Sequence, residues 1–457
     1  MRKPPAAEWE TPPPVAPKVR DDIITQRREY ELITPLFGGG VEPGYADPVT
    51  IVRGTEVRGH LRFWWRATRG GSFNGDLKDM KKKEDEIWGA PSSTDKPAPS
   101  LVQLVVACTN EGTPDHPFEV SPRGKPQARE GSLVPAYAAF PLQPSDVEAK
   151  QLRRTGAETK AVCVGVQFSV EANFRSEHRP EVEAAFWAWE TFGGIGARTR
   201  RGFGALRLTS IQERKLGEEN WQKMDLGLPA STKVVKKWIQ EKFVAFEVKG
   251  KWPENVPNLS YALAQLKVVE AQIETRNQRG GKQTTTVFTT QEVWEYLIQK
   301  LKKFRQARYD REGGKNVSND YGLSHWPEAN EIRRRLDSAT ATQPIAGIRK
   351  FPRARLGLPI NFHLPHDPGK PDVELIGTIS NRRASPLILR PLVCADEKTI
   401  GLAMVLSPTV LPPDALHLVG VPNDSLPVEV DLSKAEAVQI PPLHLETDVI
   451  KAFLSTL

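Results

Sequence analysis

Four arginines and a tryptophan are spaced so that they gather on one side of a helix. At about 100° per residue, the arginines of the segment VRGHLRFWWRATRGG fall on one face, and Trp65 borders it. These arginines are Arg58, Arg62, Arg66 and Arg69. Guanidinium groups suit phosphates and an indole can stack on a base, so the pattern favours contact with an RNA backbone. The stripe has no acidic residue at i+4, although a solvated amphipathic helix is the alternative.

A glycine-rich basic loop is the second candidate for nucleic-acid chemistry. The segment GGIGARTRRGFG at 193–204 follows a predicted helix and precedes a predicted strand, so it is neither a Walker loop nor a dinucleotide-binding turn. Its glycines would allow a close approach of the backbone to phosphates, and its arginines would supply charge. The residues we select are Gly194, Gly196, Arg198, Arg200, Arg201 and Gly202.

Positive charge is concentrated in one part of the chain. The whole sequence carries a formal charge of +7, but Arg276–Arg355 holds 17 basic and 8 acidic residues. The basic stretch 276–282 and a strip at 349–355 would extend a polyanion track. The strip consists of Arg349, Lys350, Arg353 and Arg355. A solubilising face is the alternative explanation of this charge.

The first half predicts the elements that position these residues. Strands are expected at 29–37, 101–108, 161–171 and 205–211, and helices at 56–68 and 180–192. This order is the ferredoxin-like βαββαβ pattern. Polar residues 72–98 are expected to form an exposed insertion.

The second half predicts a further α+β unit. We expect a strand from Glu241, a helix at 291–308, and short strands near 373–380, 386–393 and 401–406. The predicted fold class is therefore α+β, with two tandem ferredoxin-like, RRM-related domains and insertions. The predicted division is a proline-rich arm at 1–22, a first domain at 23–215, a linker at 216–240, a second domain at 241–420 and an acidic C-terminal segment at 421–457.

Composition excludes several classes of protein. The 457 residues contain no apolar run near 18 residues, so no membrane span is expected. The N-terminal stretch lacks the apolar core of a secretory signal, and the three cysteines are far apart. A disulfide scaffold and a C-x-x-C zinc site are therefore excluded, and we expect a cytoplasmic protein.

Eight segments in order resemble the RAMP superfamily of CRISPR-associated proteins and, within it, the first RAMP subunit of the type III-B (Cmr) effector complex. The resemblance covers about residues 28–392. The segments are YELITPLFGGG, RGTEVRGHLRFWWRA, EIWGA, FGGIGARTRRGFG, FRQARYDREGG, SHWPEANEIR, FPRARLGLPINF and RRASPLILRP.

The resemblance implies a non-catalytic RNA-binding subunit without a small-molecule cofactor or metal. Its partners would be the CRISPR guide RNA, the target RNA and other Cmr or RAMP subunits, and it would lie near the 3′ end of the guide. By the same resemblance, Arg53, Arg58, Arg62 and Arg66 match the arginines of the family's first helix and its lead-in, and 193–204 matches its glycine-rich loop. Specificity would come from base pairing between guide and target.

Two other functions stay open. Relatives in the superfamily cut RNA, so a metal-independent endoribonuclease is the main alternative; His60, the pair His363 and His366, and Asp47 are its candidate residues. His60 falls on the core side of its helix, and Asp47 next to a proline is typical of a turn. We therefore assign no catalytic residue. A purely structural assembly subunit is the other alternative.

Overall fold

The computed structural model describes residues 22–457 with internal gaps. The gaps are residues 41, 43, 48, 91–98, 261–264, 277–281, 310–315, 318–322, 337–346, 365–370, 407–415 and 423–425. All but the last residue of the expected proline-rich arm therefore lie outside the described residues.

The first half of the chain builds one antiparallel sheet with the strand order β2-β7-β1-β8-β9. Its strands are β1 (Ile23–Leu32), β2 (Gln103–Asn110), β7 (Gln167–Arg175), β8 (Leu206–Lys215) and β9 (Gln222–Lys223). With the helices α1 (Gly54–Arg69) and α4 (Arg179–Phe192), the chain follows the expected order of strand, helix, strand, strand, helix, strand. The predicted strand at 161–171 is divided in two, because Gly165 adopts a positive φ between β6 (Val162–Val164) and β7.

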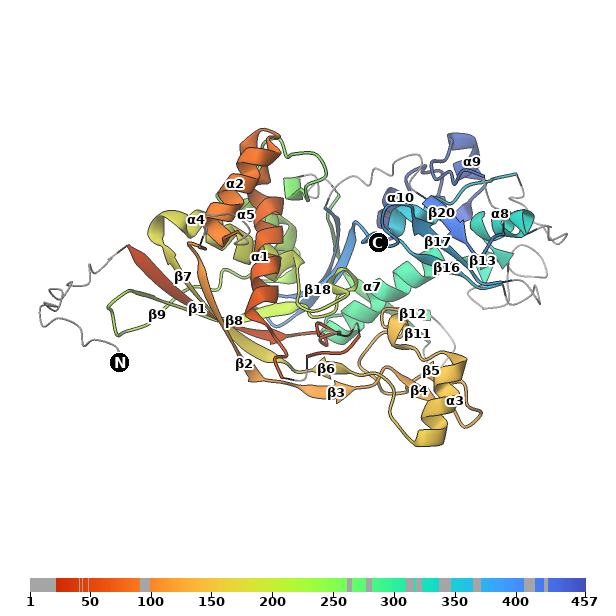
Figure 1. The fold of residues 1–457 in the computed structure, drawn as a ribbon, viewed down its shortest axis with the longest axis horizontal. Coiled ribbons are helices and arrows are strands. Elements are labelled where there is room, and N and C mark those ends of the chain that lie inside the picture. Colours follow the sequence, from red (N-terminus) through yellow and green to blue (C-terminus); the bar gives the residue numbers. More distant parts are fainter. Residues whose placement is uncertain are drawn as a thin grey trace, which may run out of the picture.

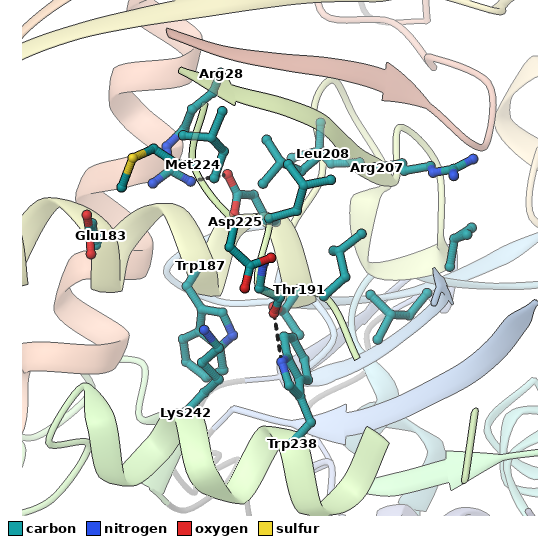
Figure 2. A pocket seen from close by; sticks show the side chains of 18 of the residues that line it. Arg28, Glu183, Trp187, Thr191, Arg207, Leu208, Met224, Asp225, Trp238 and Lys242 are labelled. Atoms are coloured by element: carbon teal, nitrogen blue, oxygen red, sulfur yellow. Dashed lines mark hydrogen bonds and ion pairs between the residues drawn. The ribbon is translucent and has the colours of Figure 1, made fainter. Parts of the chain in front are cut away.

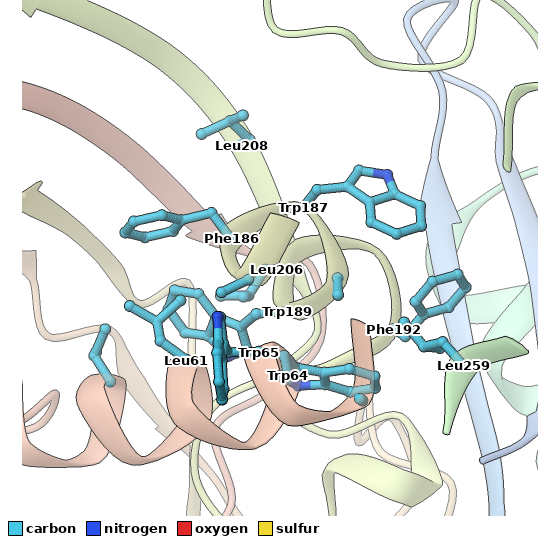
Figure 3. Close-up of a cluster of buried hydrophobic side chains, with 14 of the residues drawn as sticks. Leu61, Trp64, Trp65, Phe186, Trp187, Trp189, Phe192, Leu206, Leu208 and Leu259 are labelled. Atoms are coloured by element: carbon cyan, nitrogen blue, oxygen red, sulfur yellow. The ribbon is translucent and has the colours of Figure 1, made fainter. Parts of the chain in front are cut away.

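The helices α1 and α4 cover one side of this sheet (Figure 1). Even positions of β1, among them Tyr30, point toward them, as the period of two for a half-buried strand requires. Indole and phenyl rings from both helices fill the space beneath, as Figure 3 shows around Trp65, Trp189 and Phe186. Large aromatic side chains thus supply much of the buried area of this half.

The expected exposed insertion at 72–98 is wrong for residues 77–88, which form the helix α2 (Leu77–Trp88) against α1. Asp76 caps the helix by accepting hydrogen bonds from the amides of Lys78 and Asp79. Met80, Glu84, Ile87 and Trp88 are buried at spacings of four, three and one residue. The outer face of this segment is rich in lysine, so its charge pattern indicated an exposed insertion and did not reveal the buried stripe.

The linker predicted at 216–240 and the strand predicted from Glu241 also need correction. Residues 235–245 form the helix α5 (Val235–Ala245), whose Val235, Ile239 and Phe243 join the core of the first half. The three positions lie four residues apart, which places them on one helix face. The β-branched and aromatic content of FVAFEVKG suggested a strand, but packing of this face decides in favour of a helix.

The second half contains a three-stranded sheet with the order β10-β19-β18 and one long helix packed on it. The strands are β10 (Lys267–Val269), β18 (Leu387–Val393) and β19 (Thr399–Val405), and the helix is α7 (Thr290–Arg305). These elements supply a strand, a helix and two further strands of a βαββαβ unit. A fourth strand in this sheet is not found among the described residues, so a complete second ferredoxin-like unit is not observed there.

The acidic C-terminal segment is part of this second core. The helix α10 (Val449–Ser455) buries Val449, Ile450 and Phe453 in the same cluster as Leu297 and Leu301 of α7. A short capped helix, α9 (Lys434–Val438), precedes it.

Smaller elements surround the two sheets. Two small pairs are β3 (Thr113–Asp115) with β6, and β4 (Phe118–Val120) with β5 (Pro126–Ala128). Others are the helix α3 (Asp146–Thr155) and the hairpin of β11 (Ala271–Arg276) and β12 (Lys282–Val287). A further sheet has the order β16-β17-β20, with the strands β16 (Ile360–Phe362), β17 (Val373–Gly377) and β20 (Leu416–Val419). In the described part of the chain, no helix combines the length and the hydropathy that crossing a bilayer requires.

Candidate nucleic-acid interface

The arginines of α1 are engaged by carboxylates of neighbouring helices. Arg62 Nε lies 2.6 Å from Glu84 Oε1 and its Nη2 lies 3.1 Å from Asp85. Arg66 Nη1 lies 2.7 Å from the same Glu84 oxygen. The Glu84 side chain is only 2% exposed, so these arginines neutralise a buried carboxylate. The stripe lacks acidic residues at i+4, but α2 supplies them from outside the helix.

Trp65 is not at the surface. Its ring is fully buried, and its indole N–H donates to Glu181 Oε2 on α4 at 2.6 Å. Arg69 binds the other oxygen of Glu181 at 2.8 Å. The expectation that Trp65 offers an exposed stacking face is therefore wrong, because packing of α4 on α1 covers both Trp64 and Trp65.

The remaining arginines at this helix serve its local structure. Arg58 Nη1 donates to the carbonyls of Trp88 at 3.1 Å and Val102 at 3.4 Å. Burial, and then the charge of Arg62, lower the pKa of Arg58 below its ordinary value. Arg53 donates to the carbonyl of Gly39, while its buried Nε has no hydrogen-bond partner. Arg53 thus keeps one buried, unused donor.

The strip at 349–355 is largely neutralised by acidic residues. Lys350 Nζ lies 2.9 Å from Glu436, Arg353 Nε lies 3.1 Å from the buried Glu328, and Arg355 pairs with Asp431. Two of these three partners, Glu436 and Asp431, belong to the acidic C-terminal segment. From the sequence, that segment and the basic block were described separately, and no pairing between them was predicted. Arg349 is exposed, and no carboxylate within the described residues pairs with it. The stretch Arg276–Lys282 lies mostly outside the described residues.

The glycines of the 193–204 loop serve its internal packing. The amides of Gly196 and Gly202 already donate, to Glu56 Oε1 at 2.8 Å and to the Thr199 carbonyl at 3.0 Å. A Cβ on Gly202 would lie 2.6 Å from Trp294 Nε1, and its φ is +84°. Gly194 is held through its carbonyl, which accepts from Trp189 Nε1 at 2.9 Å. The expectation that Gly196 and Gly202 free their amides for phosphates is thus corrected.

The arginines of this loop lie close enough to Arg305 of α7 to affect one another's charge, and the four form what we call the arginine cluster. The cluster consists of Arg198, Arg200, Arg201 and Arg305. Arg201 Nη1 donates to the Leu387 carbonyl at 3.0 Å, and Arg200 donates to the Ser385 carbonyl. Arg198 Nε is buried without a hydrogen-bond partner. Across the described ranges, no carboxylate lies within ion-pair distance of any of these four side chains.

Burial and mutual repulsion act on the charges of the cluster. Burial, followed by the charge of Arg305, lowers the pKa of Arg198 to about 10. The same two causes, with smaller contributions from Arg198 and Arg200, lower the pKa of Arg201 to about 9. Charged forms that are desolvated beside like charges gain from a bound anion, which supplies the missing counter-charge.

Tyr137 is an aromatic residue at the arginine cluster, and no sequence pattern predicted its place there. Its phenol interacts electrostatically with Arg198 and Arg201, and the residue is partly exposed. It packs between the second core and the cluster around Phe203 and Trp294. The segment LVPAYAAF around it has no periodic pattern, so only the fold brings it to the arginines.

The candidate nuclease residues do not form a catalytic arrangement. Asp47 accepts hydrogen bonds from the amides of Thr50 and Val49, which lower its pKa, as expected of a turn residue. His60 is not buried as predicted: its side chain is one-quarter exposed, and its Nε2 lies 3.8 Å from Glu56. His363 pairs with Asp372 at an exposed site, and His366 lies outside the described residues. The described residues contain no group of three side chains placed to hold a metal ion.

Comparison with known proteins indicates the same class of protein as the sequence motifs and the order of strands and helices. Residues 29–207, which include the βαββ part, α4 and the glycine-rich loop, match the RAMP superfamily. This region of the chain is therefore similar to proteins of the RAMP superfamily. Within that superfamily, the chain resembles the Cmr1 subunits of type III-B Cmr systems.

One curated relative supports that resemblance, and two solved structures are similar to the chain at low identity. The Pyrococcus furiosus CRISPR system Cmr subunit Cmr1-2 is 25% identical over 191 residues, which cover 40% of this chain and 95% of that protein. The crystal structure of apo Cmr1 from Pyrococcus furiosus is 16% identical, with a TM-score of 0.45, over 85% of this chain and 90% of that one. A cryo-EM structure of type III-B Cmr-beta bound to cognate target RNA and AMPPnP contains a chain that is 12% identical, with a TM-score of 0.45, over 95% and 98% of the two chains.

Proposed function

We propose that this chain is a non-catalytic RNA-binding subunit of a type III-B CRISPR ribonucleoprotein, where it holds the 3′ region of the guide RNA and the complementary target RNA beside other Cmr subunits. The observation that carries the proposal is the arginine cluster: four arginines, two of them deeply desolvated, have no described carboxylate to balance them. Similarity to Cmr subunits supplies the choice of nucleic acid and complex.

The proposed contact is electrostatic. The arginine cluster neutralises backbone phosphates, with Arg198 Nε as an unused donor, and Tyr137 provides a partly exposed ring on which a base can stack. Phosphate contacts fix position and carry no sequence information, so sequence is read by pairing between guide and target. Arg53 and Arg349 are secondary contacts, because neither is paired with a described carboxylate.

The proposal leaves the α1 arginines and most of the 349–355 strip in structural roles. Arg62 and Arg66 neutralise Glu84, and Lys350 and Arg355 hold the C-terminal segment. Releasing both Arg62 and Arg66 to bind RNA would leave the buried Glu84 without a counter-charge, which is costly, and releasing Lys350 or Arg355 would break its ion pair.

Binding of fluorescent single-stranded RNA to the purified chain tests this function. Arg198→Gln/Arg201→Gln should weaken binding at least about tenfold, since charge-assisted hydrogen bonds are removed. The control Lys233→Gln/Lys236→Gln removes the same charge from exposed positions at the start of α5. Equal affinity of the two double variants would contradict the proposal. RNA cut in the presence of a chelator would instead support the metal-independent nuclease.

A further inference from the structure

A cavity of about 230 Å³ lies on the opposite flank of α4 from α1. It is enclosed by α4, α5, the segment at 224–228 and the end of β18, and Figure 2 shows the side chains that surround it. Such a volume holds about eight waters and is smaller than a typical drug-sized pocket. It therefore suits one ring system better than a whole nucleotide.

Aromatic rings make up much of the wall. Trp187 stands at its centre, with its ring centroid 6.3 Å from that of Trp238 and 5.3 Å from that of Phe246. The Trp238 N–H is already satisfied by the Gly227 carbonyl at 2.8 Å. Flat apolar surfaces of this kind favour a planar ligand.

One buried donor in this wall is unused. Trp187 is 6% exposed, and its indole Nε1 has no hydrogen-bond partner. Because this nitrogen has almost no accessible surface, a ligand in the cavity meets the ring of Trp187 and not its N–H.

Two charged groups at the rim are free of ion pairs. Asp225 is exposed and uses one carboxylate oxygen for the Gly227 amide, at 3.1 Å. Lys242 Nζ would lie 3.1 Å from a Cβ on that same Gly227, so it stands close to Asp225. Deeper charges are already paired; for example, Arg28 lies 2.9 Å from Glu190.

We propose that this cavity is a nucleobase-binding site, with guanine as its best ligand. The carboxylate of Asp225 accepts from adjacent N–H groups on the base edge, Lys242 donates to a ring carbonyl, and the ring of Trp187 packs against the base. Guanine presents both polar features, whereas adenine lacks the carbonyl and the pyrimidines offer a smaller ring to the aromatic wall. The base can belong to a free nucleotide or to an RNA strand.

Saturation-transfer NMR of the full chain with guanosine, adenosine, cytidine and uridine tests the site. Transfer should be strongest for guanosine, and its affinity should fall about tenfold in Lys242→Met, which keeps a side chain of similar length but loses the donor. Asp225→Asn should have a similar effect, and it lies at an exposed position where the fold tolerates change. Trp221→Phe, a tryptophan outside the cavity, should leave transfer unchanged.

Absence of transfer to every nucleoside, or equal transfer in wild type, Lys242→Met and Asp225→Asn, would overturn the proposal and leave a hydrated cavity. To separate the two sources, guanosine monophosphate is compared with short RNAs that contain or lack guanine. In Arg198→Gln/Arg201→Gln, guanosine binding should persist while RNA binding falls. The proposed guanine site and the proposed RNA contact can therefore be refuted independently of each other.

Discussion

At the scale of single residues, the surroundings of an arginine decide its role. Arg62 has two carboxylates within 3.1 Å, whereas Arg198 has a neighbouring arginine and a buried nitrogen without a partner. Arg62 therefore already has the counter-charge that a phosphate would supply. Arg198 lacks a counter-charge, so an anion is stabilised beside it.

Arg390 shows a third arginine environment, in which the charge is satisfied by carbonyls. It is fully buried, and its guanidinium donates to the carbonyls of Glu190, Gly193, Leu206 and Pro391 at 2.7–3.0 Å. Glu190 lies at the C-terminal end of α4, where the helix dipole favours a cation. Burial lowers the pKa of Arg390 to about 9.

Arg390→Met should therefore lower the free energy of unfolding by about 3 kcal/mol or more, because several buried carbonyls lose their donor. Urea unfolding gives the value. Arg349→Met, at an exposed arginine without a described ion pair, is the matched control and should change stability by less than about 0.5 kcal/mol. Equal midpoints for the two variants would contradict this role of Arg390.

Sequence alone could locate the basic loop but could not tell its arginines from those of α1. Helical spacing correctly placed Arg58, Arg62 and Arg66 on one face. The carboxylate that neutralises Arg62 and Arg66, Glu84, comes from a segment with no predicted helix or strand. Pairing between side chains of two elements depends on tertiary packing, which the spacing of residues within one helix cannot predict.

At the scale of elements, α2 is the largest departure from the sequence-based expectation. The strongly periodic segments α1, α4 and α7 were predicted within about three residues, because burial of one face dominates their stability. The helices α2 and α5 were missed, since lysines on one and β-branched residues on the other obscure a narrow apolar stripe. The strands β17, β18 and β19 were predicted, although their place in separate sheets was not.

The ion pairs between α1 and α2 predict a variant that loses stability but keeps its affinity for RNA. Arg62→Met/Arg66→Met should lower stability by about 3–5 kcal/mol, because Glu84 is left buried without a counter-charge. The RNA affinity of the folded variant should match wild type within about twofold. Thermal unfolding and RNA anisotropy, measured on the same preparation, check both parts, and the triple variant with Glu84→Leu should recover stability. A large affinity loss at retained stability would return the α1 arginines to the RNA interface.

The acidic C-terminal segment is held to the basic strip by a pH-sensitive contact. Burial alone raises the pKa of Glu436, but bonds from the Ser433 amide and from Lys350 outweigh it and leave the pKa below its ordinary value. A lowered pKa in the folded state contributes stability above the unfolded value and loses it as pH falls through the folded one.

Glu436→Gln keeps the capping geometry but loses this pH dependence. At pH 7 it should be less stable than wild type by about 0.5–1 kcal/mol. The difference should shrink as pH falls below the ordinary range of a glutamate, and it should vanish once pH is below the lowered folded pKa, since wild type is then protonated at this position. Urea midpoints between pH 3 and 7 measure it, and a difference that persists undiminished at pH 3 would contradict the ion-pair explanation.

At the scale of the whole molecule, the two halves share contacts through the glycine-rich loop and β18. Trp294 of α7 donates to the Arg201 carbonyl at 2.7 Å, and Arg201 donates to Leu387 at the start of β18. The first core also contains Leu392 of β18 and Leu402 of β19. The predicted division into domains at 215 and 241 stays a prediction, but packing continues across it.

Because the arginine cluster lies at this junction, RNA should stabilise the whole chain. A saturating short RNA, at about 100 times its dissociation constant, should add about 2.7 kcal/mol to the unfolding free energy. Without RNA, Arg198→Gln/Arg201→Gln should be at least as stable as wild type, since repulsion is removed. Thermal unfolding with and without RNA checks both statements; an equal RNA-induced shift in the variant would contradict them.

The most direct test of the account is the salt dependence of RNA binding in three proteins. The slope of log affinity against log salt should become shallower by about 1.4 in Arg198→Gln/Arg201→Gln, if each arginine neutralises one phosphate of a single strand. In Arg62→Gln/Arg66→Gln the slope should equal that of wild type. An unchanged slope in the cluster variant, with a reduced slope in the α1 variant, would show that the uncompensated cluster is not the RNA-binding site.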